Sequence, residues 1–194
     1  ELTTRLVADD DSPGYASETL QRLQTLLKTA FAEFDRVCSR ARIPYVAFAG
    51  TALGAARHGD FIPWDDDVDV AMLRPDYERF LREAPALLPS GYSIDSRETD
   101  PSYPNGFANF SLDGTQFISE AAKDRPYRMP IGIDIFPLDK VAAPGWRFAI
   151  QRLRTAFWGR LAFLLGNSKP HLPLPSWLSG AAGAAVGAIG GLLR

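Results

Sequence analysis

Four aspartates fall within five positions in the run DDDVDV at residues 65–70, where a valine stands on each side of the last aspartate. Carboxylates this close repel one another by about 1 kcal/mol per pair at 4 Å in water, and several-fold more near a protein surface. Hard divalent cations relieve this repulsion because they prefer oxygen ligands. The sequence therefore predicts a Mg²⁺ or Mn²⁺ site in this run.

The alternation of polar and apolar residues from Asp67 to Val70 predicts a half-buried strand. Extended backbone would place Asp65, Asp67 and Asp69 on one face and Asp66 on the other, with the valines. Asp67 and Asp69 are thus the expected cation pair. Asp65 is a further contact, and Asp66 is a solvent or supporting residue. An acidic surface loop is the alternative, but it leaves the interleaved valines unexplained.

A second informative strand is IGIDIFPL at residues 131–138, in which Asp134 stands between two isoleucines. A lone carboxylate in an apolar strand costs several kcal/mol unless it is paired or coordinated. We expect Asp134 to share the cation with Asp67 and Asp69. The alternatives are a turn-capping role near Pro137 and an ion pair with a nearby arginine.

The elements before the acidic run are expected to form an anion site. The apolar stretch at residues 45–49 predicts a buried strand, and Gly50-Thr51 predicts a turn that leads into a short helix at 52–57. Backbone N–H groups at a glycine turn before a helix suit phosphate oxygens. A plain tight turn is the alternative.

Two basic residues at the end of that short helix are candidate substrate contacts. Arg57 has the geometry to bind a diphosphate through two hydrogen bonds, although a surface salt bridge with Asp60 explains it equally well. His58 either donates to a phosphate or caps the loop. Gly50, Thr51, Arg57, His58 and Asp65 are therefore the predicted substrate-binding residues.

The scaffold around these residues follows from helical and strand patterns. Apolar residues at three- and four-residue spacing predict a helix from Ser17 to the stop at Pro44, with Cys38 as a small core residue. A second helix is predicted at residues 75–88. Three short strands are predicted at 92–96, 107–112 and 115–118, with a turn at 113–114.

Charge is divided unevenly along the chain. Residues 1–139 carry 14 basic and all 23 acidic side chains, whereas 140–194 carry seven basic and none. The predicted helix at 146–166 combines arginines with aromatic residues, and it either packs on the body or lies peripherally on an anionic membrane surface. Residues 177–193, where glycine recurs every fourth position, predict a closely packed terminal helix, with a membrane span as the less favoured alternative. Nucleic acid is not expected as a partner because the main body is acidic.

Length and composition indicate one sizeable core with an appendage: a flexible lead-in at 1–16, a catalytic domain at 17–145 and a helical extension at 146–194. The single cysteine favours a reducing compartment. The first residues contain no apolar signal-peptide core, and the missing initiator methionine indicates processing. We therefore expect a cytoplasmic protein, with contact to the inner face of the membrane as an option.

Three motifs in order, GTALGAARHGDFIPWDDDVDVAMLRPDYERF, ETDPSYP and IDIFPLD, resemble the LicD family over about residues 45–140. This family includes bacterial phosphorylcholine transferases and the fukutin-type ribitol-phosphate transferases. The resemblance implies an α+β fold like the nucleotidyltransferase domain of DNA polymerase β, with a mixed sheet flanked by helices. It maps the glycine turn to Gly50-Thr51, the paired carboxylates to Asp67 and Asp69, and the third carboxylate to Asp134.

The resemblance further implies transfer of a phospho-alcohol from a CDP-linked donor to a glycan hydroxyl, with Asp67, Asp69 and Asp134 holding magnesium or manganese. Asp134 would also accept the proton of the acceptor hydroxyl. Two alternatives stay open. One is a nucleotidyltransferase that adds a nucleoside monophosphate to a small molecule and releases pyrophosphate. The other is a non-catalytic binding module that keeps the fold.

Overall fold

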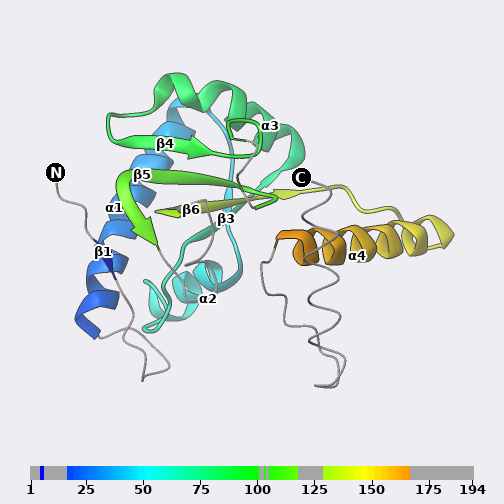
Figure 1. The fold of residues 1–194 in the computed structure, drawn as a ribbon, viewed down its shortest axis with the longest axis horizontal. Coiled ribbons are helices and arrows are strands. Elements are labelled where there is room, and N and C mark those ends of the chain that lie inside the picture. The colour runs from blue at the N-terminus through cyan, green and yellow to red at the C-terminus, as the bar shows by residue number, and fades with distance from the viewer. Residues whose placement is uncertain (1–4, 7–16, 101–102, 104, 118–128, 167–194) are drawn as a thin grey trace. The chain divides into compact units, whose positions relative to one another are not determined.

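The structure, a computed structural model, describes residues 5–6, 17–100, 103, 105–117 and 129–166, with side chains described at 18–100, 103, 105–116 and 129–160. The chain divides into two compact units, Glu1–Asp139 and Lys140–Arg194, and each is described by itself. The first unit combines helices with a mixed sheet (Figure 1), which confirms the predicted α+β class. The predicted terminal helix at 177–193 lies outside the described residues.

The first unit contains a six-stranded sheet in which β1, β5, β6, β3 and β2 follow one another and β4 pairs with β5. The two central strands, β3 and β6, run parallel, and β1 runs parallel to β5. The other pairs, β2–β3, β4–β5 and β5–β6, are antiparallel. The strands are β1 (Arg5–Leu6), β2 (Val46–Ala47), β3 (Asp69–Leu73), β4 (Tyr92–Asp95), β5 (Ala108–Phe117) and β6 (Met129–Leu138).

Helix α1 (Ser17–Ala41) confirms the long helix predicted from the apolar spacing. Its apolar stripe, which includes Leu27 and Phe34, is buried and packs against β5 and β6. Cys38 lies in the same core, as predicted, and burial raises the pKa of its thiol to about 12. The cysteine is therefore a protonated, inert core residue.

The sheet has one apolar and one polar face because its strands alternate. Ile131, Ile133 and Ile135 of β6 are buried in the core with Val70 of β3 and Phe110 of β5. The residues between them therefore point to the opposite face. That opposite face carries the candidate site.

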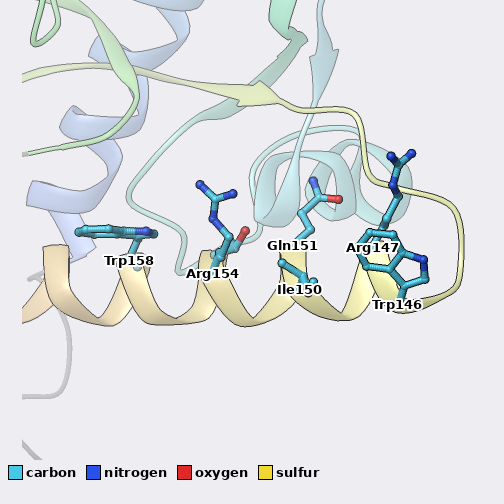
Figure 2. A pocket seen from close by; sticks show the side chains of 8 residues that line it. Trp146, Arg147, Ile150, Gln151, Arg154 and Trp158 are labelled. Atoms are coloured by element: carbon cyan, nitrogen blue, oxygen red, sulfur yellow. The ribbon is translucent and has the colours of Figure 1, made fainter.

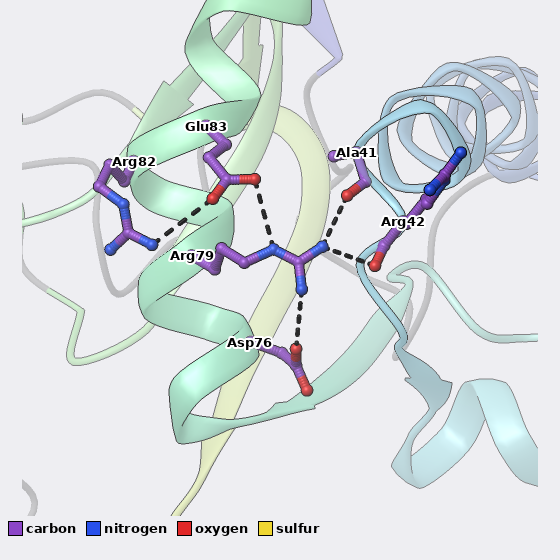
Figure 3. Close-up of polar contacts among 6 residues, drawn as sticks. All are labelled: Ala41, Arg42, Asp76, Arg79, Arg82 and Glu83. Carbon is purple, nitrogen blue, oxygen red and sulfur yellow. Dashed lines mark hydrogen bonds and ion pairs between the residues drawn. The ribbon is translucent and has the colours of Figure 1, made fainter.

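Helix α3 (Arg74–Glu83) and the short 3₁₀ helix η1 (Ala84–Leu87) occupy the predicted second helix. Figure 3 shows how Arg79 ties α3 to the end of α1: its Nη2 donates to the carbonyl oxygens of Ala41 and Arg42, both at 2.6 Å. The same guanidinium pairs with Glu83 on its own helix. Arg79 thus satisfies carbonyls that the end of a helix leaves without partners.

Two predictions about the strands are wrong. The stretch predicted as a buried strand at 45–49 forms only the two-residue strand β2 at the sheet edge, and the side chain of Val46 is 56% exposed. The strands predicted at 107–112 and 115–118 form one strand, β5, because the chain passes through Asp113 and Gly114 as an irregularity in the pairing with β6. Gly114 permits this with a φ of 74°.

The second unit contains helix α4 (Trp146–Gly166), as predicted. Its described side chains are largely exposed, including Trp146, Leu153, Phe157 and Trp158. Among the helices of the described residues, none combines the length and apolar character needed to cross a membrane.

Candidate functional site

The parallel pairing of β3 and β6 brings two predicted residues together. Asp69 and Asp134 are register partners, and the backbone N–H of Asp134 donates to the carbonyl oxygen of Val68 at 2.9 Å. At the other end of the same pair, Arg74 makes a two-fold hydrogen bond with Asp139 at 2.6 and 2.8 Å. The register that places Asp69 beside Asp134 is therefore held at both ends.

Asn109 of β5 is a site residue that the sequence analysis missed. It is the register partner of Asp134 on the other side, it is 3% exposed, and its Nδ2 donates to Asp134 Oδ1 at 2.6 Å. A polar residue between Ala108 and Phe110 in an apolar strand was the signal available in the sequence. Such a residue needs a partner for the same reason as Asp134 does.

The aspartates before β3 lie differently from the prediction. The strand begins only at Asp69, so Asp65, Asp66 and Asp67 precede it in a loop. Val68 is buried in the core, as the alternation predicted. Asp65, Asp66 and Asp67 each offer a carboxylate oxygen within 4.8 Å of the others. Asp66 therefore belongs with the other two, and its predicted placement on the opposite face is wrong.

Gly50 and Thr51 lie in the first turn of helix α2 (Ala49–His58) and not in a turn before it. The first hydrogen bond of this helix runs from the Ala52 N–H to the Phe48 carbonyl oxygen. The N–H groups before it have no partner within the helix. Thr51 has a structural contact instead of a free hydroxyl, because its Oγ1 accepts from the backbone N–H of Asp69 at 2.8 Å. The start of α2 is thereby joined to the start of β3.

Asp65 packs against the beginning of α2. A Cβ atom on Gly50 would lie 2.9 Å from Asp65 Oδ2, so the absence of a side chain at Gly50 permits this approach. The same oxygen is buried and has no hydrogen-bond partner among the described residues. A buried carboxylate oxygen without a donor is a position that a cation or a protonated group would satisfy.

The two predicted basic contacts lie at the other end of α2. Arg57 and His58 are both exposed in its last turn. The alternative salt bridge from Arg57 to Asp60 is absent in the described residues, where Asp60 pairs with Lys28 of α1 at 2.6 Å. The structure therefore does not bring Arg57 and His58 together with the carboxylates through any described contact.

The carboxylates have raised pKa values. Burial raises the pKa of Asp134 to about 7; the hydrogen bond from Asn109 opposes this, and the charges of Asp69 and Asp67 add to it. Asp67 is exposed by area, yet desolvation of its carboxylate, with the charges of Asp69, Asp65 and Asp66, raises its pKa to about 6. Burial, followed by the charge of Asp65, raises the pKa of Asp69 as well.

These features fit a hard divalent cation. The donor set consists of carboxylate oxygens, and one of them, Asp65 Oδ2, is buried without a partner among the described residues. The charges of Asp69 and Asp67 raise the pKa of Asp134, and the charge of Asp69 raises the pKa of Asp67. Mutual repulsion of this kind is what a bound cation removes. Asp67, Asp69 and Asp134 would hold such an ion, with Asp65 beside them.

The hollows among the described residues include one that Thr51 lines and one along α4. One, of about 310 Å³, is lined mostly by apolar groups between α1 and α2 and includes Thr51, Phe31, Phe61 and Val68. The other lies along α4, where Trp146, Arg147, Ile150, Gln151, Arg154 and Trp158 line one hollow, as Figure 2 shows.

Comparisons with known proteins agree with this site. Residues 42–139 match the model of the LicD/FKTN/FKRP nucleotidyltransferase domain, and this match includes all the carboxylates described above. The chain is 34% identical over 123 residues to the lipopolysaccharide cholinephosphotransferase LicD of Haemophilus influenzae, which covers 63% of this chain and 45% of that protein. It is 38% identical over 56 residues to an uncharacterized protein of Rickettsia typhi, which covers 29% of this chain and 18% of that protein.

The matched parts thus span less than half the length of these curated relatives. The family match nevertheless extends over half of this chain and contains β3, β5 and β6 with the paired aspartates. The chain belongs to the LicD/FKTN/FKRP family of nucleotidyltransferase domains.

Proposed function

We propose that the protein transfers a phospho-alcohol, of the phosphocholine, glycerol phosphate or ribitol phosphate type, from a CDP-linked donor to a hydroxyl group of a glycan, with Mg²⁺ or Mn²⁺ as cofactor. Membership of the LicD/FKTN/FKRP family and the likeness to a lipopolysaccharide cholinephosphotransferase support the transferase class and a glycan acceptor. The observation that carries the proposal is the register pairing of Asp69 with Asp134.

In this proposal the acidic residues have separate tasks. Asp67 and Asp69 hold the cation, and Asp134 completes its ligand set. When bound, the cation would neutralise the diphosphate of the donor and the charge that develops during transfer. The N-terminal N–H groups of α2, at Gly50 and Thr51, are oriented to bind phosphate oxygens. Arg57 and His58, which are exposed at the far end of α2, are proposed as further contacts to the donor.

The reaction proposed is a substitution at phosphorus. The oxygen of the glycan hydroxyl forms a bond to the phosphorus that carries the alcohol, and the bond from this phosphorus to the oxygen of CMP breaks. The hydroxyl proton passes to a carboxylate. Asp134 is proposed for this task because strand pairing holds its carboxylate beside Asp69 at the candidate site.

Release of CMP is the direct test. The full chain would be incubated with CDP-choline, CDP-glycerol or CDP-ribitol and a glycan acceptor, with Mg²⁺ or with a chelator. We expect CMP release that depends on Mg²⁺ and falls by about 10³-fold in Asp67→Ala and Asp134→Ala. Asp113→Asn is a suitable control because this exposed carboxylate lies on β5 away from the pair.

The products separate the proposal from its rivals. Pyrophosphate released from a nucleoside triphosphate, in place of CMP, would support nucleotide transfer to a small molecule. Binding of a donor without turnover of any kind would support a binding module. Unchanged Mg²⁺-dependent turnover in both alanine variants would overturn the proposed roles of the carboxylates.

We further propose peripheral contact of α4 with a membrane that carries anionic lipid. Exposed Trp146 and Trp158 with Arg147 and Arg154 form a surface that combines apolar and positive groups, and residues 140–194 contain no acidic side chain. Such surfaces bind anionic bilayers through apolar burial and charge attraction. Sedimentation with vesicles that contain 30% phosphatidylserine should exceed that with neutral vesicles. Equal sedimentation with both would argue against this contact.

A further inference from the structure

A row of polar side chains crosses four strands on the face of the sheet that carries the candidate site. The register pairs Asp69 with Asp134, Asp134 with Asn109, and Asn109 with Asp95. Paired residues on neighbouring strands point to the same face, so these four side chains follow one line across β3, β6, β5 and β4. A polar row inside a sheet is costly unless each member has a partner.

Asn109 has a partner for each end of its amide. Its Nδ2 donates to Asp134 Oδ1 at 2.6 Å, and its Oδ1 accepts from the Ser111 hydroxyl at 2.7 Å. Asp95 Oδ2 lies on the other side of the same hydroxyl. If the amide turned by half a rotation, its oxygen would face the Asp134 carboxylate, which is repulsive when the carboxylate is ionised. The ionised Asp134 carboxylate therefore favours the orientation in which Nδ2 donates to it, and the Ser111 hydroxyl shares its single proton between Asn109 Oδ1 and Asp95 Oδ2.

Strand β6 leaves the space in which this amide lies. A Cβ atom on Gly132 would overlap Asn109 Oδ1 and the carbonyl oxygen of Phe110. Gly132 stands two residues before Asp134 and points to the same face. Strand β6 thus carries the Asp134 carboxylate, and its Gly132 leaves room for the Asn109 side chain that binds this carboxylate.

We propose that Asn109 is a positioning residue for the candidate site, whose amide holds Oδ1 of Asp134 so that Oδ2 is the oxygen offered to the cation. This inference rests on the proposed function, because it takes Asp134 as a cation ligand. Oδ2 of Asp134 has no protein donor in the part of the chain that the structure describes. A carboxylate held at one oxygen loses rotational freedom before the ion binds, and such outer partners typically contribute 10- to 100-fold to metal affinity.

The test measures Mn²⁺ binding to the full chain by electron paramagnetic resonance, without donor or acceptor. Asn109→Leu replaces the amide by an apolar group of similar size, and we expect it to weaken Mn²⁺ binding by about 10- to 100-fold. Ser111→Ala, which frees the amide to turn, should weaken it by a smaller factor. Ser93→Ala is the matched control: it removes a hydroxyl bonded to Asp113 on the same strand pair, and Mn²⁺ binding should not change.

Each outcome decides the inference. Folded Asn109→Leu with wild-type Mn²⁺ affinity would overturn it and leave the proposed function intact. Wild-type protein that binds no Mn²⁺ would overturn both, and Asp134→Asn in the same titration shows whether the wild-type signal comes from this site. If Asn109→Leu does not fold, the Ser111→Ala variant provides the test. Mn²⁺ affinity equal to that of Ser93→Ala would overturn the inference, and weaker Mn²⁺ binding than in Ser93→Ala would support it.

Discussion

The acidic residues of this protein lie in two settings that differ in how firmly the fold holds them. Asp69 and Asp134 lie on neighbouring parallel strands, where backbone pairing and the Asn109 amide fix them. Asp65, Asp66 and Asp67 lie in the loop before β3 and are close mainly because they are adjacent in the chain. The same chemical group is thus fixed by the sheet in one setting and by local sequence in the other. We expect the sheet pair together with Asp67 to determine activity, and Asp65 and Asp66 to modulate it.

The largest effect should come from replacing one carboxylate in each setting. We expect Asp69→Asn to lower Mg²⁺-dependent CMP release by about 10³-fold, because it removes a charge from the fixed pair. Asp66→Asn should lower it by less than about 10-fold, since the two neighbouring loop carboxylates remain. Initial rates with CDP-choline at saturating Mg²⁺ measure both. Equal losses would show that the two settings do not differ in importance.

The next effect concerns the room that the sheet leaves for Asn109. Gly132→Ala should lower the free energy of unfolding by about 1–3 kcal/mol, because the new methyl group overlaps the amide and a strand carbonyl. Gly106→Ala is the matched control, since a Cβ at Gly106 meets no atom within 4 Å. Urea unfolding of the two variants beside wild type measures the difference. A stable Gly132→Ala variant would mean that the amide can move at little cost.

A third effect is the pH dependence of the metal-free protein. Burial raises the pKa of Asp134 to about 7, so the folded state holds a proton that the unfolded state releases near pH 4. The contribution of this group to stability is therefore fully present below about pH 4 and is lost as the pH rises through 7. The stability of Asp134→Asn relative to wild type should therefore be greater at pH 8 than at pH 4, by about 4 kcal/mol for a pKa raised from an ordinary 3.8 to about 7.

Urea midpoints from pH 4 to pH 8, with chelator present, measure this difference. Saturating Mg²⁺ should stabilise wild type at pH 8 and leave Asp134→Asn nearly unchanged, since the ion replaces the proton. A constant difference between the two proteins across this pH range would contradict the raised pKa.

The smallest effect is expected at an exposed carboxylate near the loop. Asp60 pairs with Lys28 at 2.6 Å, but each side chain is 53% exposed. Ion pairs of this kind contribute little to stability because water screens them. Asp60→Asn should therefore leave the urea midpoint unchanged, whereas a clear decrease would show that the loop is held more firmly than its exposure indicates.

The sequence by itself determined the long helix, the central strands and which residues of these strands are buried. Alternation around Asp134 predicted correctly that its isoleucine neighbours enter the core, since burial on one face imposes a two-residue period. The same rule was wrong for Asp66, because alternation applies only where the backbone is extended and paired, and β3 begins at Asp69. Local pattern does not reveal where pairing starts.

Tertiary structure alone decided which polar residues meet. Asp69 and Asp134 are 65 positions apart, and only the parallel pairing of β3 and β6 sets their register. The role of Asn109 depends on a third strand and on the space at Gly132, neither of which the local sequence specifies. The start of α2 at Ala49, which places Thr51 Oγ1 on the Asp69 N–H, likewise follows from contact with β3. Residue types determine which chemistry is available at this site. Strand pairing sets the geometry of the site, because register depends on contacts between distant segments.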